Sequence, residues 1–326
     1  MLRLFGPGCP STAVEPDKLQ VIPPGVRWID LLNPTREEEA LAERVLGQNI
    51  PTREEMQEIE PSSRLYQRHG TLFMTASVLH GITDSSPDTD PVSFILTSKL
   101  LVTVRYVDPR PFIVFSDNFA ADPDLATDPL TVLVRLMDTI VDRLADEMEQ
   151  TGREIEEVSS RIFVKGAVAT RRKRRQERTL EALLLRIGGV QRLLAEIRDS
   201  AVSTGRMLGF LGASRIARDS DCGPLIQSLQ ADIHGLLDHS NSLSDNLTFL
   251  LNASLGLISL EQNFVMKIFS VVAVVFMPPT LIAGIYGMNF EHMPELQWML
   301  GYPFALGLIL ISAILPYWIA RRMGWL

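Results

Sequence analysis

The chain has 326 residues, of which 46% are hydrophobic and 21% charged, and its formal net charge is −8. This length allows one full domain with extensions, and the negative charge argues against nucleic acid as the main partner because phosphate binding favours a basic surface. The two cysteines, Cys9 and Cys222, are too few for a disulfide scaffold or an all-cysteine zinc site. The first residues lack the sustained apolar run of a signal peptide, so we expect the polar part of the chain to stay in the cytoplasm.

The first part of the chain, 1–127, predicts a cytoplasmic α/β domain. An apolar run over 26–32 predicts a strand, and the Asn-Pro-Thr that follows predicts the cap of a helix that Gly47 ends. Polar breaks at His69-Gly70 and at Ser98-Lys99 predict two hairpins, and the Asp, Ser and Pro residues of 83–91 predict a loop. Strands are expected at 26–32, 64–67, 72–79, 91–97, 100–107 and 111–115, and helices at 36–46 and 52–59.

From Asp128 onward the pattern becomes helical. Asp128-Pro129 is typical of an N-cap followed by proline at the first helical position. Apolar residues at helical spacing predict one helix to about 164, a second from near 170 to 211, and a third that begins at Gly223-Pro224. We therefore expect long antiparallel cytoplasmic helices over 128–218 and a stalk helix over 219–263.

The third helix carries a seam of residues at alternating steps of four and three, which is typical of a coiled coil. Polar residues interrupt the seam, and Asp232 and Ser240 would admit water or ions where an all-leucine seam would be dry. The same spacing fits an ordinary antiparallel bundle helix, and the sequence leaves this alternative open. The seam consists of Leu225, Leu229, Asp232, Leu236, Ser240, Leu243, Leu247, Leu250, Ser254 and Leu257.

Two uncharged stretches, 268–289 and 297–320, are each long enough at 1.5 Å per residue to cross a hydrocarbon core about 30 Å thick. Basic residues flank the pair at Lys267, Arg321 and Arg322, and the connecting loop carries acidic residues and neither Lys nor Arg. The positive-inside rule therefore predicts a multi-pass protein of the inner (cytoplasmic) membrane with both termini in the cytoplasm. The alternative is a pair of buried core helices in a soluble protein. We expect the first span at 264–286, an outer loop at 287–297, the second span at 298–320 and a basic tail at 321–326.

Small and polar residues recur on one face of the first span, while the rest of the span is Val, Ile, Phe and Leu. Such a face either lets helices approach closely or lines a water path. A single hairpin cannot enclose a pore, so a conduit would require several copies of the chain. The residues of this stripe are Asn263, Ser270, Ala273, Met277, Thr280 and Gly284.

The loop between the spans carries a recognisable signature. Tyr-Gly-Met-Asn at 286–289, with Met-Pro-Glu-Leu at 293–296, resembles the signature loop of the CorA magnesium/cobalt channels, the two-span "GMN" metal ion family. The segment 276–285 is similar to that family's first span, and 28–35 also resembles family members. The resemblance is specific over about 260–326 and patchy but collinear elsewhere. It implies a CorA-like funnel: a homopentamer with an α/β cytoplasmic domain, long stalk helices and a pore lined by the first span.

The resemblance also implies roles for individual residues. Gly287, Met288 and Asn289 would form the selectivity filter. Magnesium holds its waters tightly, and a ring of neutral amide oxygens suits a hydrated ion better than carboxylates that bind divalent ions firmly. Glu291 and Glu295 would raise the local cation concentration. The implied pore lining, with Phe269 and Met277 as its hydrophobic constriction, is Asn263, Phe269, Ala273, Met277, Thr280 and Gly284.

These features predict a divalent cation channel and not an enzyme. The chain has no Gly-rich phosphate loop for ATP hydrolysis, and an ion of charge two gains about 4.6 kcal/mol per 100 mV of inside-negative potential. We expect no cofactor, Mg²⁺ as both the transported and the regulatory ion, and Co²⁺ and Ni²⁺ as further cargo. One alternative is a zinc transporter of the same superfamily, which His292 beside the signature keeps open. Another is a membrane-anchored coiled-coil scaffold without a pore.

The resemblance further implies a gate that closes when divalent ions bind acidic residues between subunits. The stretch 228–231 has no carboxylate where the family's stalk aspartate is expected, and Asp232 is the nearest substitute. A solvated helix face is the ordinary explanation for most such residues. The candidates are Asp232, Asp238 and Asp245 on the stalk, and Asp88, Asp90, Asp138 and Asp142 elsewhere.

Overall fold

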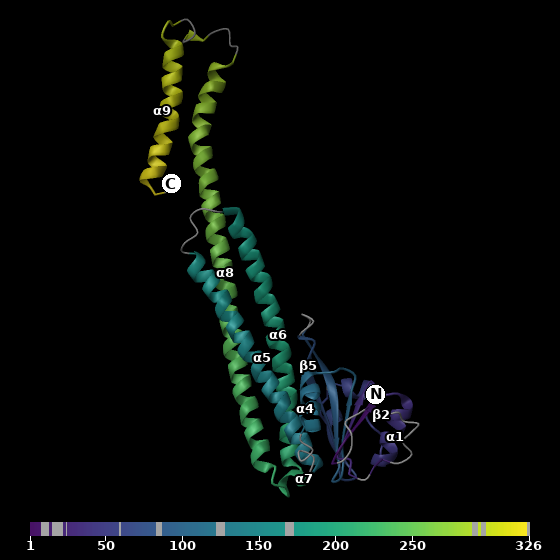
Figure 1. Cartoon of the computed structure of the whole chain (residues 1–326). Helices are drawn as coiled ribbons and strands as arrows, with labels where there is room; N and C mark the ends of the chain where they lie inside the picture. Colours follow the sequence, from purple (N-terminus) through teal and green to yellow (C-terminus); the bar gives the residue numbers. More distant parts are fainter. Residues whose placement is uncertain are drawn as a thin grey trace. The chain divides into compact units, whose positions relative to one another are not determined.

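The computed structural model describes residues 1–7, 13–14, 22–23, 25–58, 60–82, 87–121, 128–166, 173–288, 293–294 and 298–324. The chain divides into two units, Met1–Leu250 and Leu251–Leu326, which are described in turn. The boundary falls within the helix α8 (Gly223–Tyr286) (Figure 1).

The described strands of the first unit form one seven-stranded sheet in the order β2-β1-β3-β7-β6-β5-β4. β3 and β7 run parallel, and the other described pairs are antiparallel. The strands are β1 (Leu2–Phe5), β2 (Ala13–Val14), β3 (Trp28–Leu32), β4 (Leu65–Arg68), β5 (Thr71–His80), β6 (Asp88–Leu96) and β7 (Leu101–Arg105).

Both predicted hairpins are confirmed. β4 and β5 are joined by His69 and Gly70, whose φ angles of 47° and 82° suit a two-residue turn with a left-handed backbone. The β6–β7 turn is held by Thr97, whose hydroxyl oxygen accepts the N–H of Leu100 at 2.9 Å. β6 begins at Asp88, inside the segment expected to be a loop, because the ten-residue β5 pairs with it as far as His80↔Asp88.

The predicted strand at 111–115 is wrong, because this segment belongs to the helix α4 (Arg110–Ala121). Phe112, Phe115 and Phe119 recur at a helical spacing, and all three are buried in the main core. The ring centroid of Phe115 lies 5.5 Å from that of Trp28 on β3. A five-residue apolar window is too short to distinguish this helical face from a buried strand.

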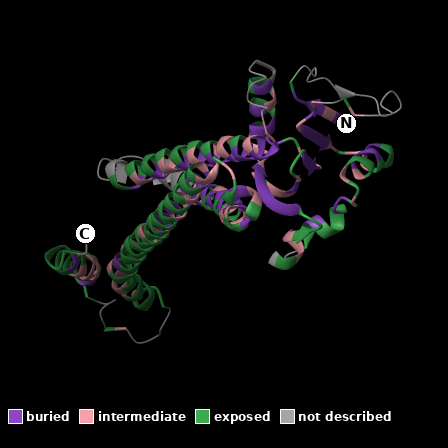
Figure 2. Ribbon diagram, turned by 90° about the horizontal axis from the view of Figure 1, so that it is seen from below, coloured by how far each residue is buried: buried purple, intermediate pink, exposed green. Residues whose placement is uncertain are grey.

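The two faces of the sheet support separate cores, because successive strand residues point to opposite sides. On one face Ile29 and Leu31 pack with residues of the short helices α1 (Arg36–Leu46) and α2 (Arg53–Gln57). The predicted α1 is confirmed, with Thr35 and Glu38 forming a capping box and Gly47 ending the helix at φ 66°. A further short helix, α3 (Pro61–Arg64), precedes β4. On the other face Trp28 joins the core that includes residues of the long helices. The strands of the sheet are largely buried (Figure 2).

The long helices are α5 (Pro129–Gly166), α6 (Lys173–Ala213), the short α7 (Arg215–Arg218) and α8. The predicted cap of α5 is confirmed, since Asp128 Oδ2 accepts the N–H of Leu130 at 3.1 Å. Glycines mark where α8 meets the other two helices. A Cβ at Gly205 of α6 would lie 2.9 Å from Ile233 Cγ2, and one at Gly152 of α5 would lie 3.8 Å from Leu243 Cδ2. These contacts make α5, α6 and the first part of α8 one bundle within the chain.

This packing decides between the two interpretations of the α8 seam. Leu229, Leu243, Leu247 and Leu250 are buried in the core shared with α5 and α6, as an ordinary bundle helix requires. Asp232 does not lie in the seam: it is exposed, and its neighbour Ile233, 1% exposed, is buried instead. The heptad pattern predicted the seam one residue too early here, because the buried position between Leu229 and Leu236 is Ile233 and not Asp232.

The second unit contains the rest of α8 and the helix α9 (Gly301–Arg322). Both helices are long and apolar enough to cross a membrane, and almost none of either apolar window is buried within the chain. This exposure argues against two core helices of a soluble protein, since the apolar side chains would be left in water. α8 continues through Pro278 and Pro279 without a break.

Candidate functional site

Four residues of the predicted stripe lie in a groove along the exposed face of α8. Ala273, Met277, Thr280 and Gly284 line it together with larger apolar neighbours such as Phe276. The groove exists because the small side chains lie between larger ones on the same helix face. Asn263 and Phe269 lie earlier on the helix, outside the groove, and Phe269 is 71% exposed. The structure therefore brings together four of the six predicted lining residues.

The hydroxyl groups of this helix are turned to its own backbone. Thr280 Oγ1 donates to the carbonyl of Phe276 at 2.7 Å, and Ser270 Oγ donates to that of Met266 at 2.9 Å. Each hydroxyl has used its proton, so Thr280, which lines the groove, can offer only lone pairs toward it. An oxygen that can accept but not donate suits a cation or the waters that surround one.

α8 ends at the Gly-Met pair of the signature. The N–H of Gly287 donates to the carbonyl of Ala283 at 2.9 Å, and that of Met288 donates to Ile285 at 3.2 Å. A Cβ at Gly287 would lie 3.1 Å from the oxygen of Ala283, so a larger residue would crowd the last turn. The remaining predicted residues of the mouth, Asn289, Glu291 and Glu295, and His292 as well, lie outside the described residues.

An acidic cluster lies where α5 approaches α8. Asp138, Asp142 and Asp146 follow one another at four-residue spacing on α5. Partial burial, and then the negative charges of Asp138, Asp146 and Asp232 of α8, raise the pKa of Asp142. The fold thus brings the predicted residues Asp138, Asp142 and Asp232 into electrostatic contact within one chain. The described residues nevertheless include no group of three side chains close enough to hold a metal ion.

The other predicted regulatory carboxylates are not part of this cluster. Asp90 Oδ2 lies 2.9 Å from His80 Nε2, which is within ion-pair distance. Nε2 nevertheless has no hydrogen-bond partner among the described residues. Asp88 accepts the N–H of Thr89 at 2.9 Å. Asp238 and Asp245 are exposed on α8.

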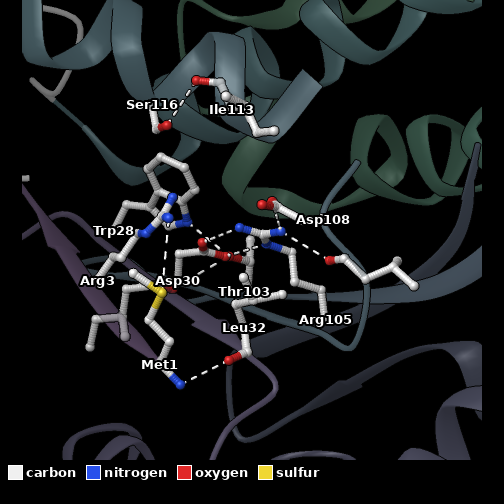
Figure 3. A network of polar contacts seen from close by, with 12 residues as sticks. Met1, Arg3, Trp28, Asp30, Leu32, Thr103, Arg105, Asp108, Ile113 and Ser116 are labelled. Carbon is white, nitrogen blue, oxygen red and sulfur yellow. Dashed lines mark hydrogen bonds and ion pairs between the residues drawn. The ribbon is translucent and has the colours of Figure 1, made fainter. Parts of the chain in front are cut away.

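A buried ion pair between β3 and β7 was missed by the sequence analysis (Figure 3). Arg105 donates to both oxygens of Asp30, from Nε at 3.0 Å and from the terminal nitrogen at 2.8 Å, and it also pairs with Asp108. Thr103 links Asp30 to the indole of Trp28 through bonds of 2.7 and 3.0 Å.

The environment of Arg105 explains how a charge is tolerated there. Burial lowers the pKa of Arg105, but the hydrogen bonds and charges of Asp30 and Asp108 outweigh it and raise the pKa. The guanidinium carbon lies 4.6 Å from the ring centre of Phe112, so the pair also orients α4. The sequence contained a signal for this buried pair, because Asp30 and Arg105 are charged residues within the otherwise apolar strands 28–32 and 101–105.

Comparison with known proteins places these features in a family. A family model described as "CorA-like Mg²⁺ transporter protein" matches residues 24–322. The magnesium transport protein CorA of Haemophilus influenzae is 32% identical over 299 residues, which cover 92% of each chain.

Solved structures show the same fold. The complete structure of the CorA magnesium transporter from Methanocaldococcus jannaschii aligns with a TM-score of 0.78 at 19% identity, covering 100% of this chain and 98% of that one. The ZntB cytoplasmic domain from Vibrio parahaemolyticus is more distant, with a TM-score of 0.54 at 9% identity, covering 71% of this chain and 87% of that one.

Proposed function

We propose, from the premise that the chain belongs to the CorA-like Mg²⁺ transporter family, that it is a membrane channel through which Mg²⁺ flows passively. The observation that carries this proposal is the groove on α8. A face of small and oxygen-bearing residues lies on an apolar helix that is unburied in the single chain. The same face on several copies would enclose a path that one copy cannot, and five copies is the number that the family resemblance implies.

In this proposal the width of the ion path varies along α8. Thr280 contributes acceptor oxygens, Ala273 and Gly284 leave room for hydrated ions, and Met277 and Phe269 form a hydrophobic constriction that gates by excluding water. Asn263 forms a polar ring at the other end of the span. These roles agree with the exposed positions of all six residues.

The filter at the mouth consists of Gly287, Met288 and Asn289. The close approach of Gly287 to the Ala283 carbonyl supports the requirement for glycine at this turn. A ring of Asn289 amide oxygens would hydrogen-bond the waters of Mg²⁺ without stripping them. Glu291 and Glu295 would attract divalent cations to the mouth, and Co²⁺ and Ni²⁺ would share the path.

The membrane potential supplies the driving force, and no cofactor or catalytic reaction is required. We place both termini on the cytoplasmic side of the inner membrane because the basic residues flank the two spans. Arg322 at the end of α9 lies with its guanidinium carbon 5.3 Å from the ring centre of Trp318, an arrangement that suits the lipid headgroup region.

The acidic cluster is the proposed sensor of cytoplasmic Mg²⁺. Partial burial, and then repulsion from the carboxylates of Asp138, Asp146 and Asp232, raise the pKa of Asp142. Divalent ions bridging them to carboxylates of an adjacent subunit would relieve the repulsion and favour a closed, symmetric state. Asp88, Asp90 and Asp238 are further ligands for such a bridge.

The zinc alternative is less favoured. The structural likeness to the ZntB domain is distant, whereas the curated relative with 92% coverage is a magnesium transport protein. Competition in liposomes that contain this protein alone distinguishes the two cargoes. The proposal predicts Mg²⁺ entry that a tenfold excess of Zn²⁺ reduces weakly, together with Co²⁺ entry that Mg²⁺ suppresses. Zn²⁺ entry that excess Mg²⁺ leaves unchanged would favour the zinc transporter, and liposomes without any ion entry would favour the scaffold.

A further inference from the structure

Helix α6 takes the place of a strand along part of the sheet edge. β4 pairs with β5 only as far as Leu65↔Met74 among the described residues, so β5 continues beyond the end of its edge partner. There the backbone N–H of Ser77 donates to Ser203 Oγ of α6, and Ser200 Oγ donates to the carbonyl of Ser77, both at 2.9 Å. Side chains of α6 thus satisfy backbone groups that an edge strand would otherwise leave unpaired.

A polar cavity of about 290 Å³ lies at this junction, between the end of β4, β5 and α6. We call it the edge cavity. Its lining includes two arginines, three residues with hydroxyl groups and one aspartate, of which Arg206 and Asp199 are also exposed to solvent. These residues are Arg64, Thr75, Ser77, Asp199, Ser203 and Arg206.

The hydrogen bonds around the edge cavity leave donors in excess. Ser77 Oγ accepts from Arg64 at 3.4 Å, and Ser203 Oγ accepts from the Ser77 backbone, so each of these hydroxyls keeps its own proton to donate. Thr75 has donated its proton to Ser93 at 3.3 Å.

The two arginines add to this excess. Arg64 uses Nε on the carbonyl of Glu58 at 2.5 Å, which leaves one terminal nitrogen uncommitted. Within the described part of the chain, no hydrogen bond, ion pair or ring contact engages Arg206. Two arginines and two serines with a proton to donate therefore line one small cavity.

We propose that the edge cavity binds a small oxyanion of the phosphate class, either free phosphate or the phosphate of a small phosphomonoester. Guanidinium groups recognise phosphate through paired charge-assisted hydrogen bonds, and serine hydroxyls supply the remaining donors. The volume is at the lower limit of small-molecule pockets, which span about 300–1,000 Å³, so it suits a small anion. Because Arg64 belongs to the sheet side and Arg206 to α6, the bound anion ties α6 to the edge of the sheet.

The carboxylate of Asp199 gives the proposal a test with two opposite outcomes. Asp199 lines the same cavity, where its charge opposes an anion. Arg206→Gln should weaken phosphate binding about tenfold, which is the usual effect of losing a charge-assisted hydrogen bond. Asp199→Asn should tighten it. Arg192→Gln, which alters an exposed arginine of α6 outside the cavity, should leave it unchanged.

The experiment uses the full chain in detergent with EDTA, so that no magnesium phosphate complex forms. Inorganic phosphate, glycerol phosphate and ATP are titrated at constant ionic strength, and binding is measured by calorimetry and by the rise in melting temperature. Saturable binding of inorganic phosphate, alone or together with glycerol phosphate, supports the site if Arg206→Gln weakens the binding, Asp199→Asn tightens it and Arg192→Gln leaves it unchanged. The absence of saturable phosphate binding, an equal loss in Arg192→Gln, or weaker binding in Asp199→Asn would overturn it. Ion transport does not enter the readout, so this result is independent of the channel proposal.

Discussion

Leu243→Ala tests whether the α8 seam holds the chain's own bundle together. Leu243 is 6% exposed, belongs to the core shared with α5 and α6, and faces Gly152 across the helix contact. Truncating a buried leucine costs about 2–5 kcal/mol, depending on how far the cavity collapses. Glycine opposite Leu243 has no side chain that could move into the space, so we expect a value in the upper half of that range.

The control is Leu185→Ala, because Leu185 lies on α6 with 74% of its side chain exposed and its removal should change stability by at most about 0.5 kcal/mol. For a unit of this size, 1 kcal/mol shifts the melting temperature by about 2–4 °C, so Leu243→Ala should melt roughly 5–20 °C below the control. The assay is thermal unfolding of the purified protein, with light scattering to follow the oligomer. Equal melting temperatures would refute the assignment, as would an oligomer that dissociates while the bundle stays folded, since that result would place Leu243 between subunits.

Four further substitutions test the filter, the acidic cluster and the buried ion pair. Asn289→Ala should abolish Mg²⁺ flux in liposomes and leave the oligomer intact on size exclusion, because the mouth loses its amide acceptors. Asp142 has a raised pKa, so the folded state binds its proton more readily than the unfolded chain, and stability should rise as pH falls through that pKa. Asp142→Asn should remove this rise from melting curves recorded against pH in EDTA. Asp232→Asn should reduce this rise in stability at low pH. It should also weaken inhibition by internal Mg²⁺ in patch recordings, and unchanged inhibition would show that the sensor lies elsewhere. Asp30→Asn should destabilise the first unit by about 3–5 kcal/mol in chemical denaturation because the buried charge of Arg105 loses its buried carboxylate partner and keeps only the more exposed Asp108, and a loss below about 1 kcal/mol would contradict the buried pair.

Local patterns predicted much of the first unit correctly. The capping box at Thr35 and the positive-φ turn at Gly70 depend on a few adjacent residues, and both were readable from the sequence. β1 was missed because its four residues carry no turn signal, and its partner β3 lies more than twenty residues away in the sequence. α4 was mistaken for a strand because its aromatic face appears only over a window longer than 111–115.

In the candidate site too, features that depend on local helix geometry were predictable and features that depend on contacts between helices were not. The groove on α8 was predictable because helix geometry alone places residues three, four and seven apart on one face. The phase of the seam around Asp232 was not, since Ile233 is buried by its contact with Gly205 of another helix. Asp146 was likewise missed, although it lies four residues after Asp142 on the same helix; the contribution of Asp232 depends on the approach of α8 to α5.

The most direct test of passive Mg²⁺ conduction is the voltage at which net flux stops in liposomes that contain the wild-type protein alone. An ion of charge two gains about 4.6 kcal/mol per 100 mV, and a tenfold concentration ratio is worth about 1.4 kcal/mol. A passive Mg²⁺ channel should therefore show zero net flux at a potential that changes by about 30 mV for each tenfold change in the Mg²⁺ gradient. No Mg²⁺ flux at any imposed potential, or a reversal potential that does not follow the Mg²⁺ gradient, would contradict the account.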